Sequence, residues 1–238
     1  MLVKADLHIH TCLSPCASLE MSPAAIAGRL ESLGFSMAAV ADHNSALNSP
    51  AFEKACRRAG IVPLFGIEVN SVEEAHLLCL FETSGAALDF GSYIYERLPD
   101  MENIPERLGD QVYVDEKENI LGEVKKYLGN AVSASMDEVM EEVFSRGGLF
   151  IPAHVDKPVF SVTSQLGFLP DGNYSAVEVF DPFNAEAFSD KWCVITSSDA
   201  HYPDDVGKNF IEIELEENSF GSLRKAFESF SKTKILLR

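Results

Sequence analysis

The chain has 238 residues, of which 46% are hydrophobic and 24% charged, so it can bury the core of an ordinary globular domain. Its formal net charge is -18, from 37 acidic and 19 basic residues, and such a field repels long polyanions. No run of 18 apolar residues occurs, and the N-terminus leads straight into a strand-like pattern. We therefore expect a cytoplasmic protein that neither crosses a membrane nor binds long nucleic acid.

In the first half of the chain, short apolar runs alternate with helical patterns. A helix is predicted from Ser22-Pro23 to about Leu33, and a second from Ser49-Pro50 to near Gly60, because serine caps and proline favours the first helical turn. The strands predicted around these helices cover residues 2–7, 37–41, 61–67 and 75–81.

The stretch 85–129 shows the least regular pattern, with one candidate hairpin in 111–123 that turns near Glu118-Asn119. Ser135 and Glu138 then form a capping box that opens a helix to about Arg146. The remaining predicted elements are strands at 149–153, 176–180, 193–197 and 210–215, a helix at 220–230 and a closing strand at 235–237.

Strands that alternate with helices favour a parallel sheet. No repeat and no linker rich in Pro, Gly or Ser divides the chain, so one barrel-like domain over residues 1–238 is the simplest prediction. In such barrels the active site lies at the C-terminal ends of the strands.

The histidines gather at that end. Five of the six follow predicted strands, namely His8, His10, His43, His154 and His201. His76 lies inside a predicted strand, where a hydrogen-bonded core histidine is the expected role.

The sequence His8-Ile9-His10 is the strongest single signal. In an extended strand, both imidazoles point to one side, with their Cα atoms about 7 Å apart. Neutral imidazole suits zinc, iron and manganese. Glu68 and Asp199 also follow strands, and a carboxylate can bridge two ions. Asp6 and Asp42 are either ordinary strand-end acids or groups that orient the imidazoles.

These motifs resemble the PHP (polymerase and histidinol phosphatase) domain superfamily. The resemblance runs from residue 3 to about 205 and rests on Asp6-Leu7-His8-Ile9-His10-Thr11, Ala41-Asp42-His43-Asn44, Gly66-Ile67-Glu68, His76, Ala153-His154 and Ser198-Asp199-Ala200-His201.

The resemblance implies a distorted (β/α)7 TIM-like barrel with two or three divalent ions, Zn, Mn or Fe. It implies three ligand groups, which are His8, His10, Glu68 and Asp199 around one ion, Glu68 with His76 and His154 around a second, and His43 with His201 around a third. His76 thereby becomes an expected ligand rather than a core residue.

One position departs from the family pattern. Members commonly carry Ser-Asp-Gly shortly after the first motif, and that aspartate helps to bind the third ion. Here Pro15 occupies its place, within Leu13-Ser14-Pro15-Cys16, and cannot ligate through its side chain. Either Cys16 or Glu20 replaces it, or the third ion is weak or absent.

The expected reaction is hydrolysis of a phosphate ester by metal-activated water, on a small phosphorylated metabolite or nucleotide. His43 or His201 would protonate the leaving alcohol if the third ion is missing. Lys157 is a candidate phosphate clamp, although a surface lysine is the ordinary alternative. For the four phenylalanines near the rim we expect core packing, with base stacking as the alternative; they are Phe160, Phe168, Phe180 and Phe183.

Three other functions remain open. The first is an oligonucleotide exonuclease. The second is an amidohydrolase-type metalloenzyme, although Glu68 stands where those barrels often need a bridging lysine. The third is a metal-binding regulatory or structural domain that has lost catalysis at Pro15, against which the intact ligands at eight other positions argue. The sequence indicates no oligomeric state.

Overall fold

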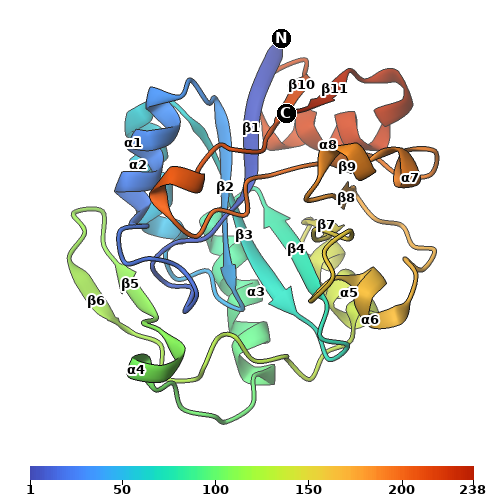
Figure 1. Cartoon of the computed structure of the whole chain (residues 1–238). Coiled ribbons are helices and arrows are strands. Elements are labelled where there is room, and N and C mark those ends of the chain that lie inside the picture. The colour runs from blue at the N-terminus through green and yellow to red at the C-terminus, as the bar shows by residue number, and fades with distance from the viewer.

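The computed structural model describes residues 1–238 and is organised around a curled sheet of seven strands (Figure 1). The strand order is β11-β10-β1-β2-β3-β4-β7. The bounds of these strands are β1 (Leu2–Ile9), β2 (Met37–His43), β3 (Val62–Asn70), β4 (His76–Phe81), β7 (Leu149–Pro152), β10 (Ile211–Glu214) and β11 (Ile235–Leu237).

The sheet is mixed, so the predicted parallel arrangement holds only in part. β1, β2 and β3 pair in parallel, whereas β4 is antiparallel to both of its neighbours, β3 and β7, and β10 is antiparallel to β1. Only residues 71–75 join β3 to β4. A connection of that length permits an antiparallel pair, because a parallel return needs a crossover of a dozen residues or more.

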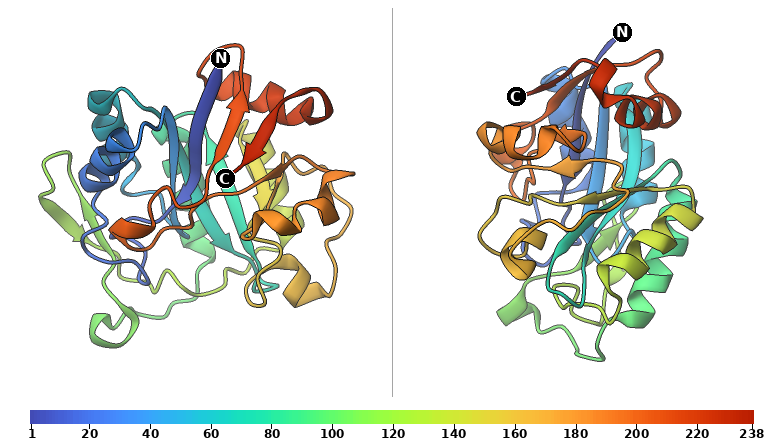
Figure 2. Two further views of the ribbon diagram at one scale, coloured as in Figure 1. Left: turned by 45° about the horizontal axis from the view of Figure 1, so that its top comes forward. Right: turned by 90° about the vertical axis from the view of Figure 1, so that its right-hand side faces the viewer.

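The predicted TIM-like barrel is corrected to an open half-barrel. β8 (Val177–Glu178) and β9 (Val194–Ile195) form a separate parallel pair, and two residues each are too few to complete a closed sheet. A few backbone hydrogen bonds link the segments next to this pair to the main sheet, from Ser175 N to Phe150 O (2.9 Å), from Asp199 N to His8 O (2.9 Å) and from His10 N to Ala200 O (3.0 Å). Figure 2 shows the orange segment with β8 and β9 on the side of the sheet opposite α3 and α5.

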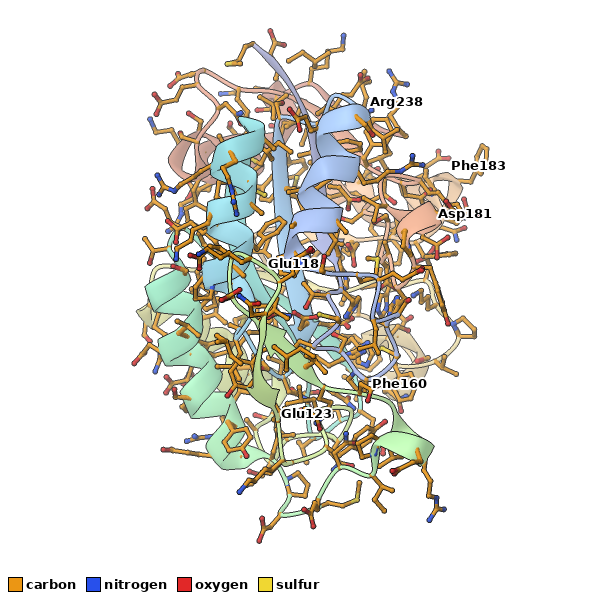
Figure 3. All side chains as sticks on the ribbon, turned by 90° about the vertical axis from the view of Figure 1, so that its left-hand side faces the viewer. Glu118, Glu123, Phe160, Asp181, Phe183 and Arg238 are labelled. Atoms are coloured by element: carbon orange, nitrogen blue, oxygen red, sulfur yellow. The ribbon has the colours of Figure 1, made fainter.

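Helices cover the outer face of the sheet, where α1 and α2 run side by side and α3 lies below α2 (Figure 3). The longer helices are α1 (Pro23–Ser32), α2 (Ser49–Ala59), α3 (Ser84–Arg97), α5 (Met136–Ser145) and α8 (Phe220–Glu228). The short ones are α4 (Pro105–Leu108), α6 (Val162–Leu166) and α7 (Glu186–Ser189), with 3-10 turns at Pro182–Asn184, Pro203–Asp205 and Phe230–Lys232. None of the helices has the length and apolar character needed to span a membrane.

Helix α3 lies in the stretch that the sequence pattern left irregular. Glycine lowers helix propensity, and Gly85 and Gly91 interrupt this segment. Gly91 sits where the helix approaches the sheet: a Cβ atom there would lie 3.3 Å from Ile67 Cδ1. The glycine therefore serves close packing, a reason that local propensity does not reveal.

Two apolar cores result from this arrangement. A cluster of 41 buried residues lies between the helices and the outer face of the sheet, and a cluster of 22 fills the concave inner face. α8 contributes Phe220, Leu223 and Phe227 to the inner core, at the end of the sheet away from the C-terminal ends of β1–β3 (Figure 1).

The predicted hairpin is present as β5 (Val112–Val114) and β6 (Ile120–Glu123), with Glu118 in the left-handed region at its turn. It packs beside the loop that follows β1, since Val112 N donates to Cys12 O at 3.2 Å. The hairpin thereby helps to fix a loop that borders the histidine cluster.

Candidate metal centre

Along each strand, the side chains that face the inside of the half-barrel change from apolar to polar at one rim. In β2, Met37, Ala39 and Ala41 belong to the inner core, and His43 follows in the same alternation. β3 repeats the pattern, with Leu64 in the inner core and Glu68 on the same side further along. The strand period of two therefore carries these side chains to the open end of the half-barrel.

In β1 an irregularity adjusts this alternation. The pairing of β1 with β2 shifts register between Asp6 and Ile9. A bulge of this kind leaves consecutive residues on one side, so Leu7 joins the inner core while His8 and His10 also turn inward. Both imidazoles are fully buried.

His76 reaches the same rim from the opposite chain direction. Because β4 is antiparallel to β3, its first residue lies beside the C-terminal end of β3. The His76 Nδ1 atom is 2.8 Å from Glu68 Oε1. The structure thus brings all six histidines together, His76 included, although the sequence placed it inside a strand.

Glu68 stands at the centre of this cluster and is only 1% exposed. Five imidazoles face its two carboxylate oxygens. The nitrogen-to-oxygen distances are 3.5 Å for His8, 3.3 Å for His10, 3.1 Å for His43, 2.8 Å for His76 and 2.9 Å for His154. Five ring nitrogens around one carboxylate exceed what hydrogen bonding needs, which points to a role in ligation.

Asp199 and His201 enter from the loop after β9. Asp199 has a positive φ of 49°, and its Oδ1 atom lies 3.1 Å from His10 Nε2 and 3.6 Å from His8 Nε2. His201 Nδ1 donates to the Asp199 carbonyl at 2.7 Å, which leaves the Nε2 lone pair of His201 free to bind a cation.

The tautomers of His8 and His10 follow from their outer partners. His8 Nδ1–H donates to Glu178 at 3.0 Å. His10 Nδ1–H donates to Ser14 Oγ at 2.9 Å, because the Ser14 hydroxyl is itself engaged as a donor to Asp42 at 2.7 Å. In the neutral form of either imidazole, Nε2 would therefore present a lone pair to the carboxylates of the cluster.

Lone pairs that face carboxylate oxygens at 3.1–3.6 Å repel one another unless a proton or a metal ion lies between them. Donor atoms on one ion at ~2.1 Å, with angles of about 90–109°, lie about 3.0–3.4 Å apart, which fits this spacing. His8 Nε2, His43 Nδ1 and Glu68 Oε2 are also buried without a hydrogen-bond partner. The donor set and its geometry thus fit divalent cations.

The pKa values of Glu68 and His10 also show that the carboxylates of the cluster favour positive charge beside them. Burial alone raises the pKa of Glu68, but His76, His8 and His43 outweigh it and hold that pKa well below its usual value. Burial opposes protonation of His10, yet its contacts with Asp199 and Glu68 raise its pKa to about 9.

Two other imidazoles, those of His43 and His201, behave in the opposite way. Burial lowers the pKa of His43 well below its usual value, although Glu68 pulls it upward. Burial and the nearby His10 lower the pKa of His201 to about 4. Both rings are therefore neutral near pH 7, the form in which imidazole binds metals.

The outer partners differ from those expected. Neither Asp6 nor Asp42 contacts an imidazole: Asp6 accepts from the backbone N–H of Ser198 and Gly207, while Asp42 acts on His10 through Ser14. Sequence reasoning missed Glu178, which holds His8 directly. A single charged residue between Val177 and Val179 in a predicted buried strand was the available signal.

Lys157 lies at the edge of the cluster, paired with Asp199 and 4.8 Å from the Phe180 ring. The expected core packing of the four rim phenylalanines is wrong, because all four are exposed: Phe160 at 45%, Phe168 at 64%, Phe180 at 47% and Phe183 at 94%. Phe160 also stacks on His76, with ring centroids 5.0 Å apart.

Three groups of side chains bring their ligand atoms within 4.8 Å of one another. They are His8, His10, Glu68 and Asp199; His43, Glu68 and His76; and His10, Cys16, His43 and His201. The first group matches the first set that the sequence resemblance implied. Glu68 links it to the second group, while Cys16 enters only the third.

This α/β half-barrel carries at one rim a cluster of histidine and carboxylate side chains with the spacing of metal ligands. The chain belongs to the PHP domain family, which matches residues 6–142, more than half of the sequence. No curated protein matches it by sequence.

Several solved structures share the fold. Endonuclease Q from Pyrococcus furiosus, a lesion-specific endonuclease, has a TM-score of 0.71 at 20% identity over 100% of this chain. An endonuclease Q complex with a 27-mer duplex that carries an abasic lesion has a TM-score of 0.70 at 20% identity over 98% of this chain. This chain spans 58% of the length of each of those two chains. A protein from Bifidobacterium adolescentis, assigned as a metal-dependent phosphoesterase, has a TM-score of 0.58 at 21% identity over 83% of this chain and 87% of its own.

Proposed function

We propose that this protein is a metal-dependent phosphoesterase that hydrolyses a small phosphorylated metabolite or nucleotide. The observation that carries the proposal is the placement of Glu68, a buried carboxylate faced by five imidazole nitrogens within 3.5 Å. Membership of the PHP family and the fold shared with a protein assigned as a phosphoesterase support the same reaction class.

In this proposal His8, His10, Glu68 and Asp199 would hold one ion, and Glu68, His76 and His154 would hold a second. Divalent ions such as Zn²⁺, Mn²⁺ or Fe²⁺, when bound, supply an activated water and positive charge for the phosphoryl oxygens.

The surrounding residues hold and orient this site. Glu178 and Ser14 fix the tautomers of His8 and His10. Lys157 lies beside Asp199, where its ammonium group can bind a phosphate oxygen of the substrate. The low pKa values of His43 and His201 favour neutral ligands over proton donors to the leaving alcohol.

A second candidate is cleavage of a phosphodiester in a nucleotide chain. Two observations favour it, namely the fold shared with endonuclease Q and the exposed rings of Phe160 and Phe180 beside the cluster. Base–aromatic stacking contributes about 1–3 kcal/mol per base, so these rings suit a nucleobase. The net charge of -18 disfavours a long duplex and leaves short single strands as the better substrate.

The test is a panel of phosphomonoesters, a diester and short single-stranded oligonucleotides, assayed with added Zn²⁺, Mn²⁺ or Fe²⁺. Glu68→Gln should lose activity by several orders of magnitude together with bound metal, since it removes the bridging charge. Glu141→Gln is the matched control on the exposed surface of α5 and should change neither property. Full metal content and full activity in Glu68→Gln would refute the proposal.

A further inference from the structure

The loop between β1 and α1 is held in a fixed shape at the rim. Asp42, itself 2% exposed, accepts from Thr11 N, Thr11 Oγ1 and Ser14 Oγ, all at 2.7 Å. Further along, Ser18 N donates to His201 O at 2.9 Å, which fastens the loop to the strand-end segment that carries His201. The loop therefore has a defined position opposite the histidines.

Cys16 lies in this loop, one residue after the proline that replaces the usual aspartate. Its Sγ atom is within 4.8 Å of ligand nitrogens of His10, His43 and His201. His10 Nε2 is already directed at Asp199 and Glu68, at 3.1 and 3.3 Å. His43 Nδ1 also lies 3.1 Å from Glu68 Oε2, so His43 borders both groups, and a separate ion would be held by Cys16, His201 and this shared imidazole.

The surroundings point to a ligand rather than to a free thiol. His43 Nδ1 is buried without a hydrogen-bond partner, and His201 Nδ1 is bonded to a carbonyl, so that its Nε2 remains available. The other four cysteines are buried, and none of them belongs to a group with metal-ligand spacing.

We propose that Cys16, as a thiolate, binds a third metal ion together with His43 and His201. The thiolate carries the same charge as the carboxylate that it replaces, so the net charge of the ion and its ligands is conserved. Its sulfur is softer, however, and an N₂S set favours Zn²⁺ or Co²⁺ over Mn²⁺. Three protein ligands also leave one coordination position open for a substrate oxygen.

This inference rests on the proposed metal-dependent function, and its test reports on the third site alone. The apo protein is loaded with Co²⁺, and both the cobalt content and the near-ultraviolet absorption are recorded, because only a thiolate ligand gives a sulfur-to-cobalt charge-transfer band there. We expect the wild-type protein to bind three ions per chain and to show the band.

The cobalt experiment is repeated with two variants of Cys16 and one variant of Cys12. Cys16→Asp should retain three ions, lose the band and shift the preference of the third site from Zn²⁺ towards Mn²⁺. Cys16→Ala should bind two ions. Cys12→Ser is the matched control in the same loop, since the Cys12 thiol donates to Val112 O, and it should keep both the band and three ions.

The outcomes separate this inference from the proposed function. A wild-type protein that binds two ions and hydrolyses phosphate esters, but shows no band at saturating cobalt, overturns the role of Cys16 and leaves the phosphoesterase standing. A band that persists in Cys16→Asp overturns it as well. A protein that binds no cobalt at all refutes both.

Discussion

His8 and Glu178 are joined by a buried hydrogen bond of 3.0 Å, from the Nδ1–H of the imidazole to one carboxylate oxygen. The same oxygen accepts from the backbone N–H of His154 at 3.1 Å. Glu178 therefore holds in place one proposed ligand of each of the two proposed ions, His8 and His154.

Glu178→Gln should weaken metal binding about tenfold to a hundredfold, because an outer partner that fixes a ligand imidazole typically contributes that much. Competition with a fluorescent chelator measures the affinity directly. Glu141→Gln again provides the surface control. An unchanged affinity would mean that the strand alone orients His8.

Lys157→Met should raise KM for a phosphorylated substrate about tenfold or more while the metal content stays constant. Loss of one charged hydrogen bond of about 1.5–3 kcal/mol gives an effect of this size. Lys157 pairs with Asp199 in the absence of a substrate, so the pair must open when a phosphate binds. Steady-state kinetics with parallel metal analysis would check this, and a change in metal content without a change in KM would contradict the phosphate role.

The apo protein should lose stability as the pH rises from 7 to about 9.5. The pKa of His10 is raised to about 9 in the folded chain, against an ordinary value near 6.5. A raised histidine pKa stabilises the fold fully below the unfolded value, and that stabilisation is lost as the pH passes through about 9.

Metal ions take over the role of these protons, so the holo protein should be less sensitive to pH. The increase in Tm on adding Zn²⁺ should therefore be larger at pH 9 than at pH 7. Thermal unfolding with and without a chelator at both pH values tests the sign. An equal increase at the two values would show that protons and metal do not compete for the same ligands.

Gly109→Ala should destabilise the protein, since a Cβ atom at this position would lie 1.9 Å from Pro15 O and the backbone has a φ of 97°. Gly34→Ala is a control for a positive φ without a clash, with a φ of 73° and no atom within 4 Å. We expect Gly34→Ala to cost about 1 kcal/mol, from left-handed backbone strain alone, and Gly109→Ala to cost distinctly more. Chemical denaturation of the two variants gives the difference, and equal losses would show that the loop at Pro15 moves freely.

The sequence by itself determined most of the local structure. The caps at Ser22 and Ser135 and the left-handed Gly60 lie at helix ends as predicted, because caps depend on neighbouring residues only. The bounds of the short strands β8 and β9 and of helix α3 were harder to predict from the sequence, because the lengths of these elements depend on packing partners elsewhere in the chain.

The sequence motifs also predicted the candidate metal ligands, because metal ligands need particular side chains at strand ends. Their arrangement, however, was decided by the tertiary structure. The antiparallel course of β4 moved His76 from an apparent core position to a contact of 2.8 Å with Glu68.

Cys16 and Glu178 complete the contrast. The motif position left Cys16 and Glu20 as alternatives at the third ion, and no local pattern pointed to Glu178 as a partner of His8. Only the folded chain brings a thiol next to His43 and His201, and a carboxylate next to His8, because such contacts depend on long-range packing rather than on spacing along the chain.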